Sequence, residues 1–235
     1  MITENMRGLI KNGATIRAMF EEGKELARKY GKENVYDFSL GNPNVETPEE
    51  IKKLICEIVS EEDSLNLHGY MSNSGYEDVR KTIANSINKK YELNIDEQSI
   101  VMTCGAAGGL NIIFKSILEE GDEVIVFAPF FGEYSNYIKN FKGKEVIAST
   151  EENTFLPDVE DLKRNITERT KAVIINSPNN PTGVIYSSKV IEDICFVLKQ
   201  KQLEYNNDIY LIADEPYREL VYDDTDVSYI FNYYD

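Results

Sequence analysis

Residues 172–183 read AVIINSPNNPTG, and this stretch decides the fold class. Four consecutive apolar residues predict a strand that is buried on both faces, which is typical of a parallel sheet covered by helices. The strand leads directly into a loop whose two prolines and one glycine restrict the backbone path. In open α/β sheets, ligands bind beyond the carboxyl ends of the strands. A rigid loop that presents Asn180 at such a place is suited to hydrogen bonding with a ligand oxygen.

Apolar runs alternate with helical patterns along the second half of the chain. We expect strands at 100–102, 124–127, 145–148, 172–175 and 209–213, with helices at 110–118, 134–141 and 190–198. Nearer the N-terminus, helical patterns cover about 15–29, 48–59 and 75–91, and residues 74–77 form a capping-box pattern. This order predicts an α/β fold with a mostly parallel sheet flanked by helices, preceded by a helical N-terminal segment.

Composition narrows the possible partners. The chain has 41 acidic residues against 25 basic ones and a net charge of -16, so its surface repels nucleic-acid phosphates and anionic lipid. We therefore expect a small-molecule partner, and neither nucleic acid nor membrane. There is no long apolar run and no secretory signal. The three cysteines are scattered, which favours a reducing cytoplasm and predicts small core residues. The acidic run at 223–226 predicts a solvated loop, and no metal site is expected.

Two further segments follow apolar runs in the same way. Residues 100–109 read IVMTCGAAGG, and their small side chains let backbone N–H groups approach an anion at a helix N-terminus. Taken alone, this pattern also fits a plain tight turn. Residues 209–217 read IYLIADEPY, which places Asp214 at the end of a buried strand. A carboxylate there requires a cation or hydrogen-bond donors, and a protonated pyridine nitrogen would be such a cation.

These three segments, in this order and at these spacings, resemble the fold-type I pyridoxal-phosphate (PLP) enzymes of the class I/II aminotransferase family. The resemblance extends over about residues 37–219 and includes DFSLGNP at 37–43. It implies a PLP-binding large domain at 46–235, preceded by a helical, substrate-side segment at 1–45. It also implies pyridoxal 5'-phosphate as the cofactor, with an amino acid and a 2-oxo acid as substrates.

The resemblance assigns roles to the residues that would hold the phosphate and the ring of the cofactor. Gly105, Ala106 and Ala107 resemble the backbone turn that cradles the phosphate. Phe131 resembles the aromatic residue that stacks on the pyridine ring, and the neighbouring Phe130 is the competing candidate. Core packing is an alternative explanation for either phenylalanine.

Further roles follow from the same resemblance. Asn180 and Tyr217 would hydrogen-bond the phenolic oxygen of the cofactor, and Asp214 would pair with its ring nitrogen. Gly41 would lie near the substrate carboxylate. Tyr70 would reach the cofactor phosphate of a neighbouring subunit, which implies a homodimer with shared active sites.

The family's covalent anchor is a lysine that lies well beyond the aspartate and forms a Schiff base with PLP. No lysine occurs between Glu215 and Asp235. We therefore expect this lysine to lie beyond Asp235, no catalytic residue within the chain, and a truncated and inactive piece of an aminotransferase. A PLP-dependent lyase of the same fold, such as a carbon–sulfur β-lyase, remains an alternative because the same motifs hold its cofactor. A ligand-sensing regulator with an aminotransferase-like domain is a further alternative.

Overall fold

The computed structural model describes residues 2–4, 6–8, 14–38, 41 and 45–234. The chain divides into two compact units, Met1–Tyr70 and Met71–Asp235. The domain division predicted at residue 45 concerns the organisation of the whole protein and stays a prediction. In the part of the chain that is described, no helix combines the length and apolarity that crossing a membrane requires.

The first unit is helical. It contains α2 (Ala14–Tyr30), the short 3-10 helix η1 (Lys32–Asn34), α3 (Glu49–Glu61) and α4 (Ser64–His68). The helices predicted at about 15–29 and 48–59 are confirmed, and Pro48 precedes the first residue of α3. Asp63 caps α4 because its carboxylate accepts the N–H groups of Leu65 and Asn66 at 2.9 and 3.2 Å.

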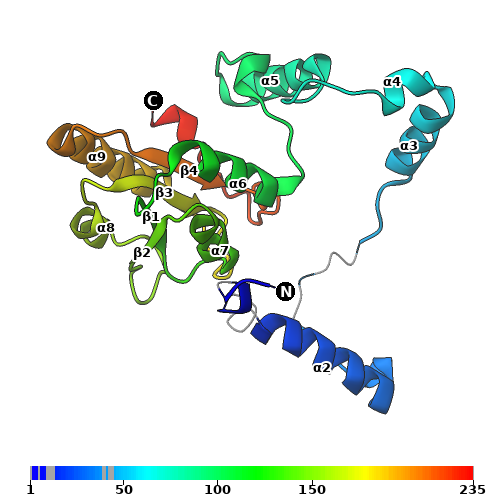
Figure 1. Ribbon diagram of the computed structural model, residues 1–235, viewed down its shortest axis with the longest axis horizontal. Coiled ribbons are helices and arrows are strands. Elements are labelled where there is room, and N and C mark those ends of the chain that lie inside the picture. The colour runs from blue at the N-terminus through cyan, green and yellow to red at the C-terminus, as the bar shows by residue number, and fades with distance from the viewer. Residues whose placement is uncertain (1, 5, 9–13, 39–40, 42–44, 235) are drawn as a thin grey trace. The chain divides into compact units, whose positions relative to one another are not determined.

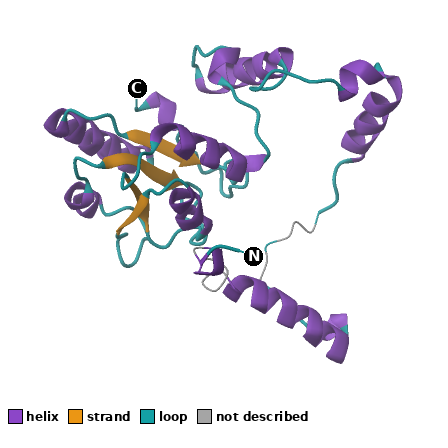
Figure 2. Cartoon of the chain, in the orientation of Figure 1, coloured by secondary structure: helices purple, strands orange, loops and turns teal. Residues whose placement is uncertain are grey.

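The second unit contains one parallel sheet, shown in orange in Figure 2. Its strands are β1 (Glu123–Phe127), β2 (Lys144–Ala148), β3 (Thr170–Asn176) and β4 (Tyr210–Asp214), in the order β2-β1-β3-β4. The helices are α5 (Glu77–Tyr91), α6 (Gly105–Ile117), α7 (Glu133–Asn140), α8 (Val159–Asn165) and α9 (Ser188–Tyr205), with the 3-10 turns η2 (Glu97–Ser99) and η3 (Ile230–Asn232). The predicted α/β class is confirmed.

Alternating side chains of the strands build two cores, one on each face of the sheet. Figure 1 shows the helices and the strands that contribute these side chains. Val124 and Val126 of β1 pack on one face with Leu110 and Phe114 of α6, and α7 contributes to the same cluster. The intervening residues, such as Ile125, point to the other face, where α8 and α9 cover them. Strands buried on both faces explain why these runs are apolar at nearly every position.

Two local predictions are wrong. Residues 100–102 form no strand: Val101 and Met102 are exposed, and the N–H of Met102 donates to the carbonyl of Ser74 at 2.9 Å. The capping box is wrong as well, because α5 begins at Glu77 after Tyr76 and its N-cap makes no side-chain hydrogen bond. Ser74 lies two residues before the N-cap Tyr76, so the capping-box pattern is out of register with the helix terminus.

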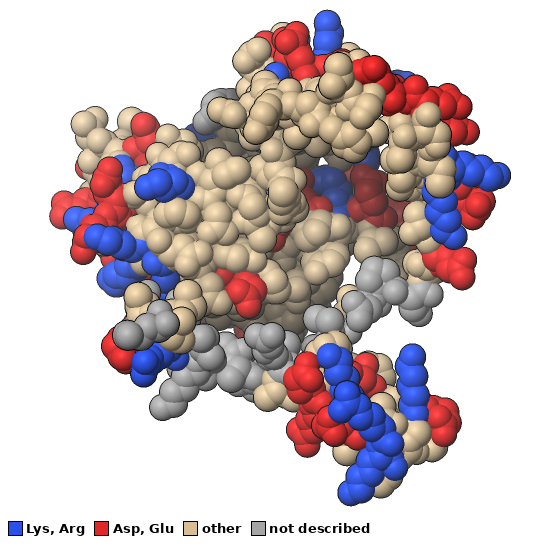
Figure 3. Space-filling view, turned by 45° about the vertical axis from the view of Figure 1, so that its right-hand side comes forward, with Lys and Arg blue, Asp and Glu red and all other residues tan. Residues whose placement is uncertain are grey.

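The surface carries charges of both signs. On the face drawn in Figure 3, acidic and basic side chains are intermingled among uncharged residues. The predicted loop at 223–226 is confirmed as an exposed turn. Cys195 is buried as expected, whereas Cys56 and Cys104 are exposed, so the expectation of core cysteines is wrong at these two positions.

Candidate active site

Two of the predicted site segments meet where β3 and β4 end. The register pairs Asn176 with Asp214, the last residues of the two strands. The buried Asn176 Nδ2 donates to the backbone carbonyl of Asp214 at 2.7 Å, and its Oδ1 accepts the backbone N–H of Asn180 at 2.6 Å. One amide side chain thereby joins the loop that carries Asn180 to the strand that carries Asp214. The sequence analysis missed Asn176, whose signal is an amide at the end of an apolar run.

The loop after β3 is closed by its own hydrogen bonds. Asn179 accepts the N–H of Gly183 at its carbonyl (2.8 Å), and its backbone N–H donates to the carbonyl of Val184 (2.9 Å). Its side-chain oxygen accepts both the N–H and the hydroxyl of Thr182. Gly183 has a φ of 74°, which disfavours residues that carry a Cβ. Because Asn179 is used internally, Asn180 is the asparagine of this loop that remains available to a ligand.

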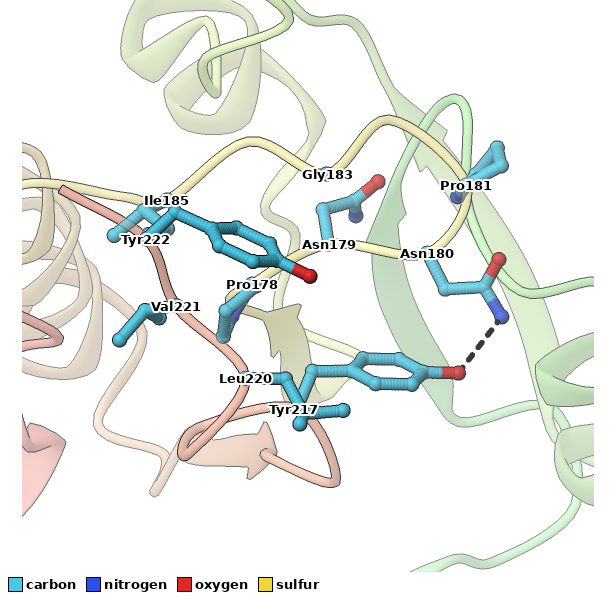
Figure 4. Close-up of a pocket in the computed structure, with 10 residues that line it drawn as sticks. All are labelled: Pro178, Asn179, Asn180, Pro181, Gly183, Ile185, Tyr217, Leu220, Val221 and Tyr222. Atoms are coloured by element: carbon cyan, nitrogen blue, oxygen red, sulfur yellow. Dashed lines mark hydrogen bonds between the residues drawn. The ribbon is translucent and has the colours of Figure 1, made fainter. Parts of the chain in front are cut away.

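Asn180 lies beside Tyr217, as Figure 4 shows. Its Nδ2 donates to the hydroxyl oxygen of Tyr217 at 3.4 Å. The phenolic proton of Tyr217 is therefore free to donate to another oxygen. Both side chains border a cavity of about 420 Å³. It is lined by Pro178, Asn179, Asn180, Pro181, Gly183, Ile185, Tyr217, Leu220, Val221 and Tyr222. Asp214 does not line this cavity.

Arg218 fixes the turn that carries Tyr217. Its guanidinium donates to the carboxylate of Glu215 and to the backbone carbonyls of Val227 and Ser228, the last two at 2.6 and 2.9 Å. These contacts hold both flanks of Tyr217, because Glu215 precedes it and Arg218 follows it. The turn is therefore anchored to the segment that follows it, nine and ten residues further along the chain.

Asp214 has a neutral hydrogen-bond partner. The hydroxyl of Tyr134, in the first turn of α7, donates to Asp214 Oδ2 at 2.5 Å. Burial, followed by the hydrogen bond to this carboxylate, raises the pKa of Tyr134 far above its ordinary value, so its hydroxyl keeps its proton. Among the described residues, no ion pair to Asp214 is formed. The half-buried carboxylate is thus oriented by a phenol without being neutralised by a cation.

Phe130 and Phe131 occupy different environments. Phe130 packs against the core cluster of α6 and α7, and its ring lies parallel to that of Tyr134, with 6.5 Å between centroids. Phe131 is 37% exposed and meets Tyr134 edge-on, with centroids 5.6 Å apart. Core packing is therefore the role of Phe130, and the ring of Phe131 is the one accessible to a ligand. Stacking by Phe131 stays a prediction.

The N-terminus of α6 lies at the same edge of the sheet. Residues 118–122 connect the end of α6 to the start of β1, and a helix of this length spans about 20 Å against about 17 Å for the strand. The first turn of α6 therefore reaches the carboxyl end of β1. Gly105 has a φ of 72° with open space around it, Ala106 and Ala107 are exposed, and Cys104 makes no side-chain cap. The uncapped N–H groups of this turn fit an anion.

Gly41 and Tyr70 belong to the first unit. No heavy atom lies within 4 Å of the position that a Cβ on Gly41 would occupy, and Tyr70 is fully exposed. Their roles at the substrate and at a neighbouring subunit stay predictions. His68, which has no assigned role, is the exposed last residue of α4.

The groups at the strand ends are suited to binding three different parts of one ligand. A carboxylate without a cation fits a protonated ring nitrogen, the amide and phenol of Asn180 and Tyr217 fit a ring oxygen, and the helix N-terminus fits a phosphate. This donor set fits a phosphorylated pyridine, and the fold is that of an α/β enzyme domain which binds its ligand at the carboxyl edge of a parallel sheet.

Comparison with known proteins identifies the family within this class. The chain belongs to the aminotransferase class I and II family, whose model matches residues 33–233. It is 32% identical over 219 residues to an aspartate aminotransferase of Pyrococcus horikoshii, covering 93% of this chain and 52% of that protein. It is also 32% identical over 225 residues to the aspartate/prephenate aminotransferase of Thermus thermophilus, covering 93% of this chain and 55% of that protein.

Solved structures agree with the family assignment. An amino transferase from Eubacterium rectale superposes with a TM-score of 0.95 at 39% identity, covering 100% of this chain and 59% of the other. An aspartate aminotransferase from Thermotoga maritima gives a TM-score of 0.81 at 31% identity, covering 93% of this chain and 55% of the other. The chain spans about half the length of the curated relatives it matches.

Proposed function

We propose that this chain is part of an amino acid aminotransferase and that its second unit holds pyridoxal 5'-phosphate. The observation that carries the proposal is the arrangement at the ends of β3 and β4, where Asn176 joins the backbones of Asp214 and Asn180, and Asn180 contacts Tyr217. Membership of the aminotransferase class I and II family supports it. The relatives named above are aminotransferases, which favours amino transfer over a lyase or a sensor.

Each residue of the site would bind a different part of the cofactor. Asp214 pairs with the protonated ring nitrogen, which keeps the ring electron-poor. Asn180 and Tyr217, which lie in hydrogen-bond contact with each other, would donate hydrogen bonds to the phenolic oxygen of the cofactor. The exposed ring of Phe131 would stack on the cofactor ring and exclude water from it. When bound, the cofactor supplies the electron sink that amino-group chemistry requires.

The phosphate is held by backbone rather than by side chains. The N–H groups of Ala106 and Ala107 donate to it, and the open position at Gly105 lets its oxygens approach closely. A positive helix terminus also favours the anion electrostatically. We further propose that Tyr70 reaches the phosphate of a neighbouring subunit in a cytoplasmic homodimer.

The substrates of the complete enzyme are an amino acid and a 2-oxo acid, with Gly41 beside the substrate carboxylate. The Thermus thermophilus relative is named for aspartate and prephenate. We propose that this chain contributes the non-covalent part of the cofactor site and that the Schiff-base lysine is not among its 235 residues. As it stands, the chain would bind PLP reversibly without turnover.

Absorbance and fluorescence titration of the chain with PLP tests cofactor binding. Saturable binding that Asp214→Ala weakens is expected. Borohydride reduction followed by mass spectrometry should leave no PLP–lysine adduct, and a stoichiometric adduct would refute the missing lysine. Amino transfer from aspartate to a 2-oxo acid is measured on the complete gene product. Release of a thiol, pyruvate and ammonia from an S-substituted cysteine, without amino transfer from aspartate, would favour the lyase.

A further inference from the structure

We propose that Tyr134 is a positioning residue for Asp214. Its hydroxyl engages one carboxylate oxygen and thereby leaves the other directed at the ring nitrogen of the cofactor. The inference rests on the proposed function, because it requires that Asp214 meets this nitrogen. It goes further because it assigns a second residue, Tyr134 of helix α7, to the contact that Asp214 makes from the end of strand β4.

The geometry fixes the donor firmly. Tyr134 is only 1% exposed, and its hydroxyl lies 2.5 Å from Asp214 Oδ2. Its ring is part of the core cluster of α6 and α7, with Phe130 parallel to it and Phe131 against its edge. A phenol packed in this way has few alternative rotamers, so its hydroxyl cannot follow a rotating carboxylate. Asp214 must adapt to Tyr134 instead.

The backbone of Asp214 is held independently. Its carbonyl accepts the hydrogen bond from Asn176, and the register with β3 sets the end of the strand. With the main chain and Oδ2 both fixed, the torsion angles of the side chain are determined. Oδ1 then has a single orientation before any ligand arrives. This pre-organisation removes an entropic cost from the binding of a cationic ring.

The neutrality of the donor matters as much as its position. Lysine or arginine at residue 134 would neutralise Asp214 and compete with the ring nitrogen. A phenol donates a hydrogen bond and leaves the full negative charge in place. The burial of Tyr134 and its contact with Asp214 also raise its pKa, so it remains a donor throughout the working pH range of the protein.

The test compares two ligands. PLP and its deaza analogue, in which carbon replaces the ring nitrogen, are titrated into the wild-type chain, Tyr134→Phe, Asp214→Asn and the double variant. Tyr134→Phe should weaken PLP about tenfold, the scale of a hydrogen bond to a charged group. Binding of the analogue should change less than about twofold, because it makes no contact that depends on the charge of Asp214. In the Asp214→Asn background, Tyr134→Phe should have no further effect on PLP.

The matched control is Tyr137→Phe on the same helix. Among the described residues, Tyr137 makes no hydrogen bond to Asp214, so its loss should leave the preference for PLP over the analogue unchanged. This preference is independent of the folded fraction, because both ligands meet the same molecules, and it keeps the test decisive if Tyr134→Phe lowers stability. Equal weakening of both ligands by Tyr134→Phe, or independent effects of Tyr134→Phe and Asp214→Asn, would overturn the positioning role. Unchanged PLP binding by Asp214→Asn would instead refute the proposed role of Asp214.

Discussion

The carboxylates at the two ends of the parallel sheet differ in the charge of the groups that they contact. At the amino end, Glu123 pairs with Lys144 at 2.8 Å and accepts the hydroxyl of Thr167, and Asp122 pairs with Arg169 at 3.3 Å. At the carboxyl end, Asp214 meets only the uncharged hydroxyl of Tyr134 at its side chain within the described part of the chain.

This difference distinguishes carboxylates that stabilise the fold from a carboxylate that is available to bind a ligand. Glu123 and Asp122 are both buried, and burial of a carboxylate is tolerated when a cation of the same chain accompanies it. Asp214 accepts a hydrogen bond that orients it and forms no ion pair with any residue that the structure describes, so its charge remains available to a cationic ligand. The same residue type stabilises the fold at one end and is reserved for binding at the other.

Replacement of Asp214 should have the largest effect on binding. Asp214→Ala removes the half-buried carboxylate that would pair with the ring nitrogen, and we expect PLP affinity to fall by about 100-fold. The free energy of unfolding should change little, because the side chain has one neutral contact. Fluorescence titration and urea unfolding measure the two quantities. The opposite pattern, a loss of stability with unchanged affinity, would make Asp214 a structural carboxylate like Glu123.

Replacement of Asn176 should lower both the PLP affinity and the free energy of unfolding. Asn176→Ala removes the hydrogen bonds to Asp214 and Asn180 and leaves buried partners unpaired, which costs about 2 kcal/mol of the free energy of unfolding. PLP affinity should fall in parallel because the loop and the strand lose their connection. Ser116→Ala, which removes an exposed bond within α6, is the control and should change stability by less than about 0.5 kcal/mol. If folded Asn176→Ala keeps its PLP affinity, the loop that carries Asn180 does not need the hydrogen bonds of Asn176 to keep its conformation.

At the amino end, Glu123 should make stability depend on pH without affecting PLP. Burial acts to raise the pKa of Glu123, but hydrogen bonds from Lys144 and Thr167 and the charges of Lys144 and Arg169 outweigh it, so the pKa lies below its ordinary 4.5. Its contribution is therefore fully present above pH 4.5 and is lost as the pH falls through the lowered pKa. Glu123→Gln should reduce the free energy of unfolding by about 1 kcal/mol at neutral pH and flatten its decline in acid. A change in PLP affinity would contradict the separation of the two ends.

Thiol labelling should give the smallest effect. Burial raises the pKa of Cys195 to about 11, so this thiol should react only after unfolding, whereas the exposed Cys104 reacts in the native state. Because Cys104 precedes the first turn of α6, bound PLP should slow its alkylation severalfold. Mass spectrometry of labelled peptides measures the rates, with the exposed Cys56 as the internal reference. Equal slowing at both exposed cysteines would place the phosphate elsewhere.

The strands that build the sheet were predictable because the apolar runs at 124–127 and 172–175 are buried on both faces. The run at 100–102 has the same composition, yet it is exposed and bonds to Ser74, because composition does not report whether a neighbouring strand is present. The proximity of Asn180 and Tyr217 was implied by the family resemblance, which assigns both residues to the same oxygen of the cofactor. Tyr134 and Asn176 could not be found in this way. Their contacts depend on helix docking and strand register, which are tertiary properties.

The order β2-β1-β3-β4 also has a kinetic consequence. Each parallel pairing joins strands separated by a crossover, so loop closure must precede the gain from pairing, and such sheets assemble slowly. Asp214 ends the strand at the edge of this sheet, and its side chain meets a tyrosine that arrives with α7 from much earlier in the chain. Competence to bind the ring would therefore arise late in refolding. The appearance of a PLP signal during refolding would time the docking of β4 against β3.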